Sequence, residues 1–595
     1  MLLISCGESS NGTQAGGGGR GVSGDAGAGD DVPLAGEAGT KAQGGSSMGG
    51  SKAQGGNGNH AGDGVVGGAA ETAGTGTMGG QSSGDGGASA GAGGEGQVTP
   101  ACVDADGDGY GEHCSALDCD DANPLVNPSM LELADDGLDN DCLNGDLKAK
   151  DGPGYYVNGS DAGCSDGQSA TGTKQQPYCT VELAVVKAYQ ATAADDRTGR
   201  SIFVAKGTYP HMVGTPRSMR IYGGYDAADW SYDPAKNVTT IGGADTIKDV
   251  DNFAGYEMWL NVNGQARVVV QGFHITGGKR PGAPIKAVEI NSAGRVELYD
   301  NVIVAGEGVQ TLGVNIFGDD KNDPATSDVW LIKNRISAGT PSTSSNYGLN
   351  NLGTAVLWGN VIDMGQGAAN SFGAAVQNYG VMTLVNNVLN GGDYGANVLA
   401  SYGLINAKAD GLPDPGVAAA YHNVIFGGRG STSSVGVSNN AELILVNNVL
   451  GDRTPGPLTF AQRPSSVALP LGTGFAATTL LVANDLFNLI YSDEVSPPNA
   501  GANRHLFQYS DQSTHSVDDL AVLNACAWTG CTAGTAQNIA DAPGFTADFH
   551  LSPSSSLISK GADPGHAAGM GLPNLDIDNQ LRPLSGGRDI GIDER

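Results

Sequence analysis

Short runs of apolar residues recur along the middle of the chain, and most contain an Asn just before their last apolar residues. The eight copies read RVVVQGFHI, RVELYDNVI, VWLIKNRI, AVLWGNVI, TLVNNVL, AYHNVI, LILVNNVL and LLVANDL. Their last apolar residues are Ile275, Ile303, Ile336, Ile362, Leu389, Ile425, Leu450 and Leu486, so the steps by subtraction are 28, 33, 26, 27, 36, 25 and 36 residues. One β-rich phrase per period of this length predicts a solenoid, in which each repeat forms one coil.

The composition of each phrase indicates a strand buried in a parallel sheet, because it is short, apolar and rich in β-branched residues. We therefore predict an all-β fold, a parallel β-helix whose strands stack coil upon coil. The recurring Asn is expected at a corner of each coil, where it tolerates left-handed backbone angles and can bond the amide of the next Asn. We interpret this ladder as structural and not as a set of sugar or metal ligands. Its members are Asn301, Asn334, Asn360, Asn387, Asn423, Asn448 and Asn484.

The segment before the repeats predicts strands and one helix. Thr180 can cap a helix that ends near Thr192, since apolar residues follow it at helical spacing. These apolar residues are Leu183, Ala184, Val186 and Ala188. The predicted strands cover Tyr155–Val157, Ser201–Tyr209 and Met219–Asp226.

Residues 7–100 consist mainly of Gly, Ala, Ser and Thr and show no apolar period. Such a segment cannot bury enough surface to offset its ordering entropy, so we predict a disordered, flexible linker. Composition thus divides the chain into residues 1–6, the linker 7–100, a small Asp- and Cys-rich module at 101–150 and a β-helix domain at 151–595.

The first residues resemble the lipobox of bacterial lipoproteins, in which a Cys is acylated. The match is Leu3-Ile4-Ser5-Cys6, although almost none of the usual basic and apolar part precedes it. The resemblance implies lipidation of Cys6, an anchor in a membrane, and a location at the bacterial outer membrane or cell surface, or secretion.

The chain is acidic, with 63 Asp and Glu against 31 Lys and Arg and a net charge of −32. This sign argues against nucleic acid as a partner, because phosphates require a basic surface. It suits a solvated exterior and the binding of cations.

Eight cysteines other than Cys6 are even in number and locally clustered, which in an exported chain predicts disulfides. Pairing of neighbours suggests Cys164–Cys179 and Cys526–Cys531. The remaining four are Cys102, Cys114, Cys119 and Cys142, and they allow three connectivities. A zinc site is the weaker interpretation, since there is no Cys-x-x-Cys.

The sequence DADGDGYG, residues 104–111, matches the start of a calcium loop. It offers alternating carboxylates, a Gly for the turn and a backbone carbonyl from Tyr110. Ser115 stands where an EF-hand has Glu, so other oxygens must complete the site. Twelve acidic residues and no Lys or Arg lie between Asp104 and Asp141, a density that requires neutralising cations. The predicted ligands are Asp104, Asp106, Asp108, Tyr110, Asp118, Asp120, Asp121, Asp136, Asp139 and Asp141.

The order D-x-D-G-D-G-Y-G, D-C-D-D-x-N-P-x-V-N-P and D-D-G-x-D-N-D-C resembles the metal-binding motif of bacterial surface proteins, including MopE-type proteins and many from myxobacteria. The match spans residues 104–142, with Ser129-Met130-Leu131 in place of the usual residues before Glu132. The resemblance implies a surface or secreted protein that binds a metal, calcium being the expected ion, and it implies no catalysis.

Residues 155–595 resemble the pectin-lyase-like right-handed parallel β-helix proteins. The likeness rests on YYVNGSDAGCSDG, SIFVAKGTYPH and MRIYGGYDAADW near the start, and on DIDNQLRPLSGGRDIGIDE at the end. Asn579 and Ile592 replace the usual Gly and Ala of such endings. The resemblance implies a right-handed coil whose N-terminal end is capped by the predicted helix.

These features predict a surface lipoprotein whose non-catalytic β-helix serves adhesion or binds a polysaccharide or other glycan. The first alternative is a polysaccharide lyase or glycoside hydrolase, which needs clustered carboxylates or a basic residue beside calcium. The residues considered for that role are Asp319, Asp320, Lys279, Arg280 and Arg335, and none forms a recognisable catalytic pattern. The second alternative is a structural component of the envelope.

Overall fold

The computed structural model of the chain describes much of residues 102–595. The gaps are 194–198, 210–216, 244–255, 263, 265, 281, 319–326, 342, 369–370, 393–399, 408–415, 429–432, 440, 452–462, 471–488, 492–504, 511–513, 518, 526–537, 540–543, 547–548, 562–573 and 583–586. Several predictions fall outside these described residues: the linker, Cys6, Asn484, Asp319, Asp320 and the Cys526–Cys531 disulfide. Residues 95–595 form one compact unit.

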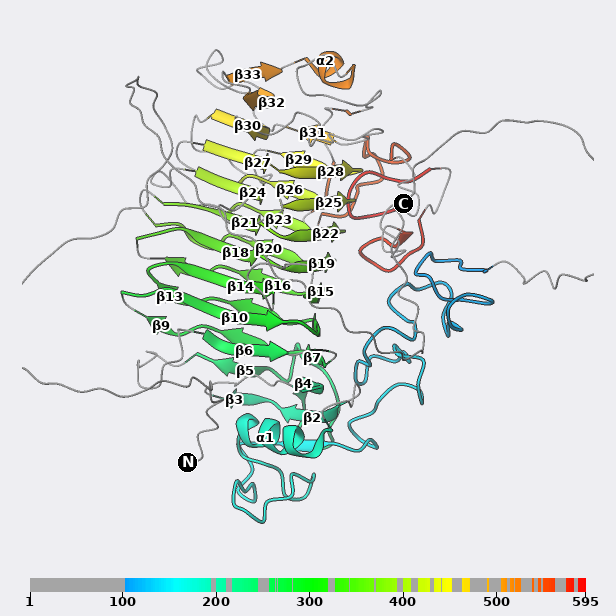
Figure 1. Cartoon of the computed structure of the whole chain (residues 1–595), viewed down its shortest axis with the longest axis vertical. Helices are drawn as coiled ribbons and strands as arrows, with labels where there is room; N and C mark the ends of the chain where they lie inside the picture. The colour runs from blue at the N-terminus through cyan, green and yellow to red at the C-terminus, as the bar shows by residue number, and fades with distance from the viewer. Residues whose placement is uncertain are drawn as a thin grey trace, which may run out of the picture. The chain divides into compact units, whose positions relative to one another are not determined.

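Three long sheets wind around one core and form a parallel β-helix (Figure 1). The first sheet contains β1 (Tyr155–Val157), β2 (Arg200–Ala205), β4 (Met219–Tyr225), β7 (Arg267–Gln271), β11 (Arg295–Tyr299), β15 (Asp328–Ile332), β19 (Thr354–Trp358), β22 (Val381–Val385), β25 (Val417–Tyr421) and β28 (Glu442–Val446). The second contains β6 (Tyr256–Val262), β10 (Ile285–Ser292), β14 (Thr311–Gly318), β18 (Asn346–Asn351), β21 (Phe372–Asn378), β24 (Ala400–Asn406), β27 (Ser433–Asn439), β30 (Arg463–Pro470), β32 (His505–Ser510) and β33 (Thr514–Val517).

The third sheet contains β3 (Gly207–Tyr209), β5 (Thr239–Gly242), β8 (His274–Thr276), β12 (Val302–Val304), β16 (Arg335–Ser337), β20 (Val361–Asp363), β23 (Val388–Asn390), β26 (Val424–Phe426), β29 (Val449–Gly451) and β31 (Leu489–Tyr491). A small sheet adds β9 (Lys279–Arg280), β13 (Glu307–Gly308) and β17 (Thr340–Pro341). Within the described residues, every pair of these strands is parallel except β32 with β33. The predicted parallel β-helix is confirmed, and the hand of the coil stays a prediction.

Each of the seven phrases from RVVVQGFHI to LILVNNVL forms two strands of one coil, one in the first sheet and one in the third, and the eighth phrase, LLVANDL, lies outside the described residues. For example, Arg295–Tyr299 pairs with Asp328–Ile332, while Val302–Val304 pairs with Arg335–Ser337. Val296, Leu298 and Ile303 are fully buried in the core. The predicted strand Ser201–Tyr209 divides in the same way, because the chain turns at Lys206 between β2 and β3.

The corner between these two strands corrects one prediction. The left-handed backbone angle belongs to the residue before the ladder Asn and not to the ladder Asn. The residues before the ladder Asn that have positive φ are Asp300, Lys333, Gly359, Asn386, His422 and Asn447, and Gly272 has a similar angle before Phe273. The short polar or Gly side chains at most of these positions tolerate this conformation. The ladder Asn itself points inward and satisfies the backbone of the turn.

The predicted Asn ladder is confirmed from Asn301 to Asn448. The backbone N–H and the Nδ2 of Asn334 both donate to Oδ1 of Asn360, at 2.9 and 3.1 Å. Nδ2 of Asn360 donates in turn to Oδ1 of Asn387 at 2.9 Å and to the Leu331 carbonyl at 2.7 Å. Each side-chain amide is therefore satisfied inside the core, which supports the structural interpretation.

A second ladder, which sequence analysis did not predict, runs through the second sheet. Asn351 donates to Asn378, Asn378 to Asn406 and Asn406 to Asn439, over 2.8, 2.8 and 2.6 Å. Strand pairing puts these amides in one inward column with apolar residues of the preceding coils. Leu260 pairs with Ile290, Ile290 with Ile316, and Ile316 with Asn351. Asn-containing strand ends such as SNNA are the signal that could have revealed it.

The helix α1 (Val181–Ala191) confirms the predicted helix, and Thr180 accepts a hydrogen bond from the Leu183 backbone as its N-cap. It packs against β1 and β2 in the first coil (Figure 1). Val186 is 38% exposed, contrary to the predicted apolar face. Val181, Ala184, Val185 and Ala188 form the buried face instead. A second, short helix is α2 (Leu520–Asn524).

Residues 102–150 pack on the outer face of the first sheet; we call this segment the acidic module. Its contacts are with an outward column of polar and aromatic side chains. The Tyr222 hydroxyl donates to the Glu132 carbonyl at 2.7 Å, and the Tyr156 hydroxyl donates to the Ala149 carbonyl at 2.7 Å. Oε1 of Gln271 accepts from the backbone of the module at 3.1 Å. The module therefore covers a surface that the coil alone would leave exposed.

Residues 574–582 and 587–595, the closing segment, cover the same face further along the coil. Nδ2 of Asn386 donates to the Leu575 carbonyl at 2.6 Å, and the Gly591 backbone donates to the Asn447 carbonyl at 2.9 Å. A fully buried ion pair of 2.9 Å joins Arg582 to Glu594 within it. These contacts fall on the corner residues with positive φ, so the closing segment uses the turn geometry of the coil as its docking surface.

Candidate metal centre

The loop from Asp104 to Tyr110 turns tightly around its own carboxylates. The Asp104 carboxylate accepts from the backbone of Gly107 at 2.6 Å and of Gly109 at 2.9 Å. Both glycines have positive φ, which a side chain would oppose. Asp106 and Asp108 each accept from the backbone two residues later. Every second side chain is thereby held on the inner side of the loop.

A second stretch of chain brings Asp118 and Asp121 to the same point. Carboxylate oxygens of Asp104, Asp106 and Asp108 lie within 4.8 Å of one another, and so do those of Asp106, Asp118 and Asp121. Asp106 belongs to both sets and is fully buried. We call these five residues the first acidic group.

Three carboxylate oxygens in this group are buried without a hydrogen-bond partner among the described residues. They are Oδ2 of Asp106, Oδ2 of Asp108 and Oδ2 of Asp118. Burial, followed by the charge of Asp108, raises the pKa of Asp106 to about 7. Burial likewise raises the pKa of Asp108 to about 6 and raises that of Asp118. A cation at this point would supply the missing partner for these three oxygens.

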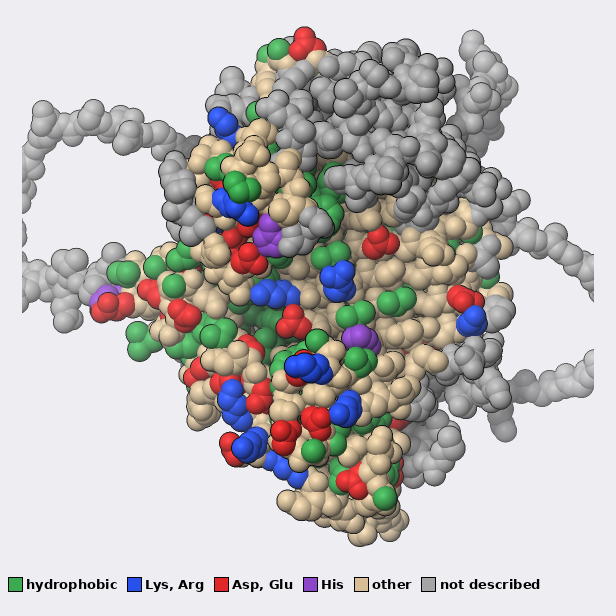
Figure 2. All heavy atoms as spheres, turned by 180° about the vertical axis from the view of Figure 1, so that it is seen from behind, with side chains coloured by type: hydrophobic (Ala, Val, Ile, Leu, Met, Phe, Trp, Pro, Cys, Tyr) green, Lys and Arg blue, Asp and Glu red, His purple; other side chains and the backbone are tan. Residues whose placement is uncertain are grey.

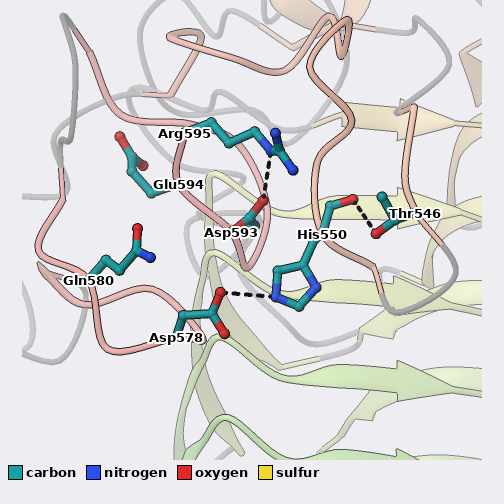
Figure 3. Close-up of a pocket in the computed structure, with 7 residues that line it drawn as sticks. All are labelled: Thr546, His550, Asp578, Gln580, Asp593, Glu594 and Arg595. Atoms are coloured by element: carbon teal, nitrogen blue, oxygen red, sulfur yellow. Dashed lines mark hydrogen bonds and ion pairs between the residues drawn. The ribbon is translucent and has the colours of Figure 1, made fainter.

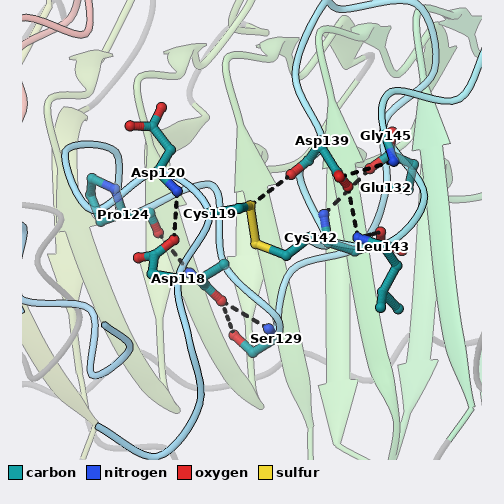
Figure 4. The surroundings of a disulfide bond; sticks show 12 residues. Asp118, Cys119, Asp120, Pro124, Ser129, Glu132, Asp139, Cys142, Leu143 and Gly145 are labelled. Atoms are coloured by element: carbon teal, nitrogen blue, oxygen red, sulfur yellow. Dashed lines mark hydrogen bonds between the residues drawn. A yellow bond between two sulfur atoms is a disulfide. The ribbon is translucent and has the colours of Figure 1, made fainter. Parts of the chain in front are cut away.

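A second acidic group consists of Glu132, Asp139 and Asp141, whose donor oxygens lie within 4.8 Å (Figure 4 labels Glu132 and Asp139). Sequence analysis missed Glu132, whose pKa is raised to about 7 mainly by burial. Backbone N–H groups already occupy much of this group, since Glu132 accepts from Leu147 at 2.8 Å and Asp139 accepts from Leu143 at 2.8 Å. Arg220 lies 3.4 Å from Asp141 and supplies positive charge. This group is therefore partly neutralised within the protein.

Three predicted ligands are not brought into either group. The Asp120 carboxylate points away from Asp118 in Figure 4. Asp120 contacts the Asp118 carboxylate through its backbone N–H, which donates at 2.9 Å. Asp136 accepts from Asn140 and the Leu138 backbone. The Tyr110 backbone N–H donates to Asp108 at 2.8 Å, and no contact in the structure assigns the Tyr110 carbonyl to the site.

Three disulfides hold the N-terminal part of the structure. Cys102–Cys114 and Cys119–Cys142 are formed from the four cysteines whose connectivity the sequence left open, and Cys164–Cys179 is formed as predicted. Cys119–Cys142 joins the stretch that carries Asp118 to the stretch that carries Asp141 (Figure 4). Bonded sulfurs do not ligate zinc, so the zinc interpretation of these cysteines is excluded.

The outer face of the second sheet carries a polar and aromatic stripe. Nδ2 of Asn315 donates to Glu289 at 2.9 Å, and Nδ2 of Asn350 donates to Asn315 at 2.8 Å. Gln377 follows in register and donates to the Tyr379 hydroxyl at 2.8 Å. Glu289 is the only carboxylate in the described part of this register column, and it also pairs with a lysine, Lys286.

The surface of the acidic module is both acidic and apolar. Figure 2 shows acidic and hydrophobic side chains together on the part of the surface that the acidic module forms. Val103, Leu117, Leu138 and Leu143 are among its exposed apolar residues. Within the described residues, no helix has the length and apolar character that a membrane crossing requires.

No protein-family model, curated protein or solved structure matches the chain.

Proposed function

We propose that the acidic module binds calcium and that the ion fixes the module onto the first sheet of the β-helix. The observation that carries the proposal is the set of three buried, unpartnered carboxylate oxygens on Asp106, Asp108 and Asp118. Their donors converge with those of Asp104 and Asp121. An apo site with raised carboxylate pKa values is a site in which bound positive charge is favourable.

Calcium is the best fit because every donor in the first acidic group is an oxygen. Calcium accepts six to eight oxygens in a flexible arrangement, whereas magnesium demands a small octahedral site and zinc favours nitrogen and sulfur. The first acidic group supplies five carboxylates from two stretches of chain. Water and backbone carbonyls can complete such a shell.

We further propose that the whole chain is a cell-surface lipoprotein, anchored through Cys6 or secreted, whose β-helix binds a polysaccharide. Support comes from the half-buried Asn350 and Tyr379 of the stripe, since an amide and an aromatic ring are suitable for sugar hydroxyls and sugar faces. Glu289, Asn315 and Gln377 of the same stripe are buried. A hydrolase would require two carboxylates at a set separation. The described stripe offers only Glu289, so a binding role is favoured over catalysis.

Calcium titration of the full chain tests the metal proposal, with the protein first treated with a chelator. The wild type should bind calcium and melt at a higher temperature with it. Asp106→Asn should lose at least tenfold in affinity, because Asp106 belongs to both donor sets. Asp120→Asn is the matched control and should bind as the wild type does.

Equal calcium affinity in Asp106→Asn, Asp120→Asn and the wild type would contradict the site.

The same three proteins, applied to a glycan array with and without calcium, test the binding role. Glycan capture without degradation supports it, whereas release of sugar fragments would support the lyase or hydrolase alternative. If the array shows neither glycan capture nor fragment release, a structural component of the envelope is the remaining explanation.

A further inference from the structure

A pocket of about 520 Å³ lies between the closing segment and residues 544–561 (Figure 3). It is separate from both acidic groups and was not predicted from the sequence. Its lining combines three acidic residues with one His and one Arg. The lining residues are Thr546, His550, Asp578, Gln580, Asp593, Glu594 and Arg595.

Three side chains converge in this pocket from three stretches of chain. His550, Asp578 and Asp593 each offer one donor atom, and these atoms lie within 4.8 Å of one another. Nε2 of His550 lies 3.1 Å from Oδ2 of Asp578 (Figure 3). Unlike the two acidic groups, this set contains a ring nitrogen.

Hydrogen bonds fix the backbone that carries Asp578 and His550 and the side chain of Asp593. The Asp578 backbone donates to the buried Asp576 at 2.9 Å, which fixes the turn that carries Asp578. The His550 carbonyl accepts from the backbone and the hydroxyl of Thr546, at 2.8 and 3.1 Å. Oδ2 of Asp593 accepts from the Leu551 backbone at 2.8 Å. Outer contacts of this kind preorganise metal ligands.

We propose that His550, Asp578 and Asp593 bind a divalent transition metal of the zinc class. One imidazole and two carboxylates form a donor set that zinc accepts, with three protein ligands and an open position. The open position faces the pocket, where water or a ligand oxygen completes the coordination. The ion ties the closing segment to residues 549–551, beyond the contacts already present.

A neighbouring side chain, Arg595, provides a further test of the metal site. Nε of Arg595 lies 3.7 Å from Oδ2 of Asp593, and the Arg595 side chain is 41% exposed. The guanidinium therefore competes with a metal for the Asp593 carboxylate. Because the guanidinium opposes a second positive charge, Arg595→Ala should tighten zinc binding.

Zinc titration of the full chain tests the proposal, with calcium present in excess so that the oxygen-only groups are occupied. The wild type should bind one zinc ion in the pocket. His550→Gln should weaken binding by more than about tenfold, and Arg595→Ala should strengthen it. His113→Gln is the matched control, since His113 lies in the acidic module, 3.5 Å from Glu112. Loss of zinc in His113→Gln but not in His550→Gln would overturn the proposal.

X-ray absorption at the zinc edge gives a second readout that does not depend on the stability of a variant. One imidazole with oxygen neighbours supports the site. A shell of oxygen alone, or one with sulfur, would overturn it. Calcium titration of His550→Gln separates this inference from the proposed function, because calcium affinity should stay at the wild-type value.

Discussion

At the scale of single residues, His422 is the buried titratable group that the fold leaves neutral. It occupies the corner position between Asn386 and Asn447, with positive φ and no exposed surface. Its Nε2 lies 3.2 Å from Nδ2 of Asn447. Burial, followed by the charges of Arg582 and Arg588, lowers the pKa of His422 well below its usual value.

This environment predicts an acid sensitivity that one substitution removes. Below about pH 6.5 the unfolded chain protonates His422 while the native state does not, so stability falls as the pH falls through that window. Between pH 6.5 and 5.5 the wild type should lose about 1 kcal/mol more than His422→Asn. Urea unfolding at a series of pH values measures the difference. Asn is the natural substitute because the adjacent coils carry it, and parallel pH curves would contradict the prediction.

The candidate calcium ligands show how far single residues can be predicted. Alternation of Asp104, Asp106 and Asp108 is local, so the turn that brings them together follows from the sequence. Glu132 joins Asp139 and Asp141 only because the acidic module folds back on itself and onto Tyr222. Asp120 has the same composition signal as its neighbours, yet its side chain points away. Packing, and not residue type, decides which of these acidic residues share a site.

At the scale of elements, the Asn ladder replaces apolar packing at one corner of the coil. Each amide satisfies both the next Asn and a backbone carbonyl, as Asn360 does with Asn387 and Leu331. A buried network of this kind is stable only while every member is satisfied. The ladder therefore couples each coil to its neighbours.

Asn360→Ala should cost about 3–5 kcal/mol, because several buried groups would lose their partners at once. These include both donors of Asn334 and the Leu331 carbonyl. Asn350→Ala is the control, since Asn350 is half-buried on the outer stripe, and it should cost less than about 1.5 kcal/mol. Urea midpoints of the two variants measure the contrast. Equal losses of stability would show that a ladder Asn contributes no more to stability than an Asn of the outer stripe.

At the scale of the whole described structure, two segments that are not strands of the coil cover one sheet. The acidic module covers the early coils and the closing segment covers the later ones, and Nδ2 of Asn574 joins them through the Asp106 carbonyl at 2.8 Å. The closing segment depends on the buried pair of Arg582 and Glu594. Arg582 also donates to the Gly591 carbonyl at 3.0 Å.

Arg582→Met should destabilise the protein by about 3–5 kcal/mol, because the buried Glu594 charge would lose the guanidinium that neutralises it. Hydrogen exchange should rise in the closing segment and, through Asn574, around Asp106. Arg335→Met is the matched control, since Arg335 is exposed and should change little. Unchanged exchange at Asp106 in Arg582→Met would show that the two covering segments are independent.

The sequence by itself determined the coil, since a strand phrase repeated every 25 to 36 residues can bury its apolar side chains only by stacking. It also determined α1, the first Asn ladder and the turn of the Asp104 loop, because these depend on local spacing. Only the tertiary structure decided which corner residue adopts positive φ, which cysteines pair and which acids share a site. It also decided where the module docks and that His550 meets Asp578 and Asp593. Those outcomes depend on segments far apart in the chain, whose contacts no local pattern encodes.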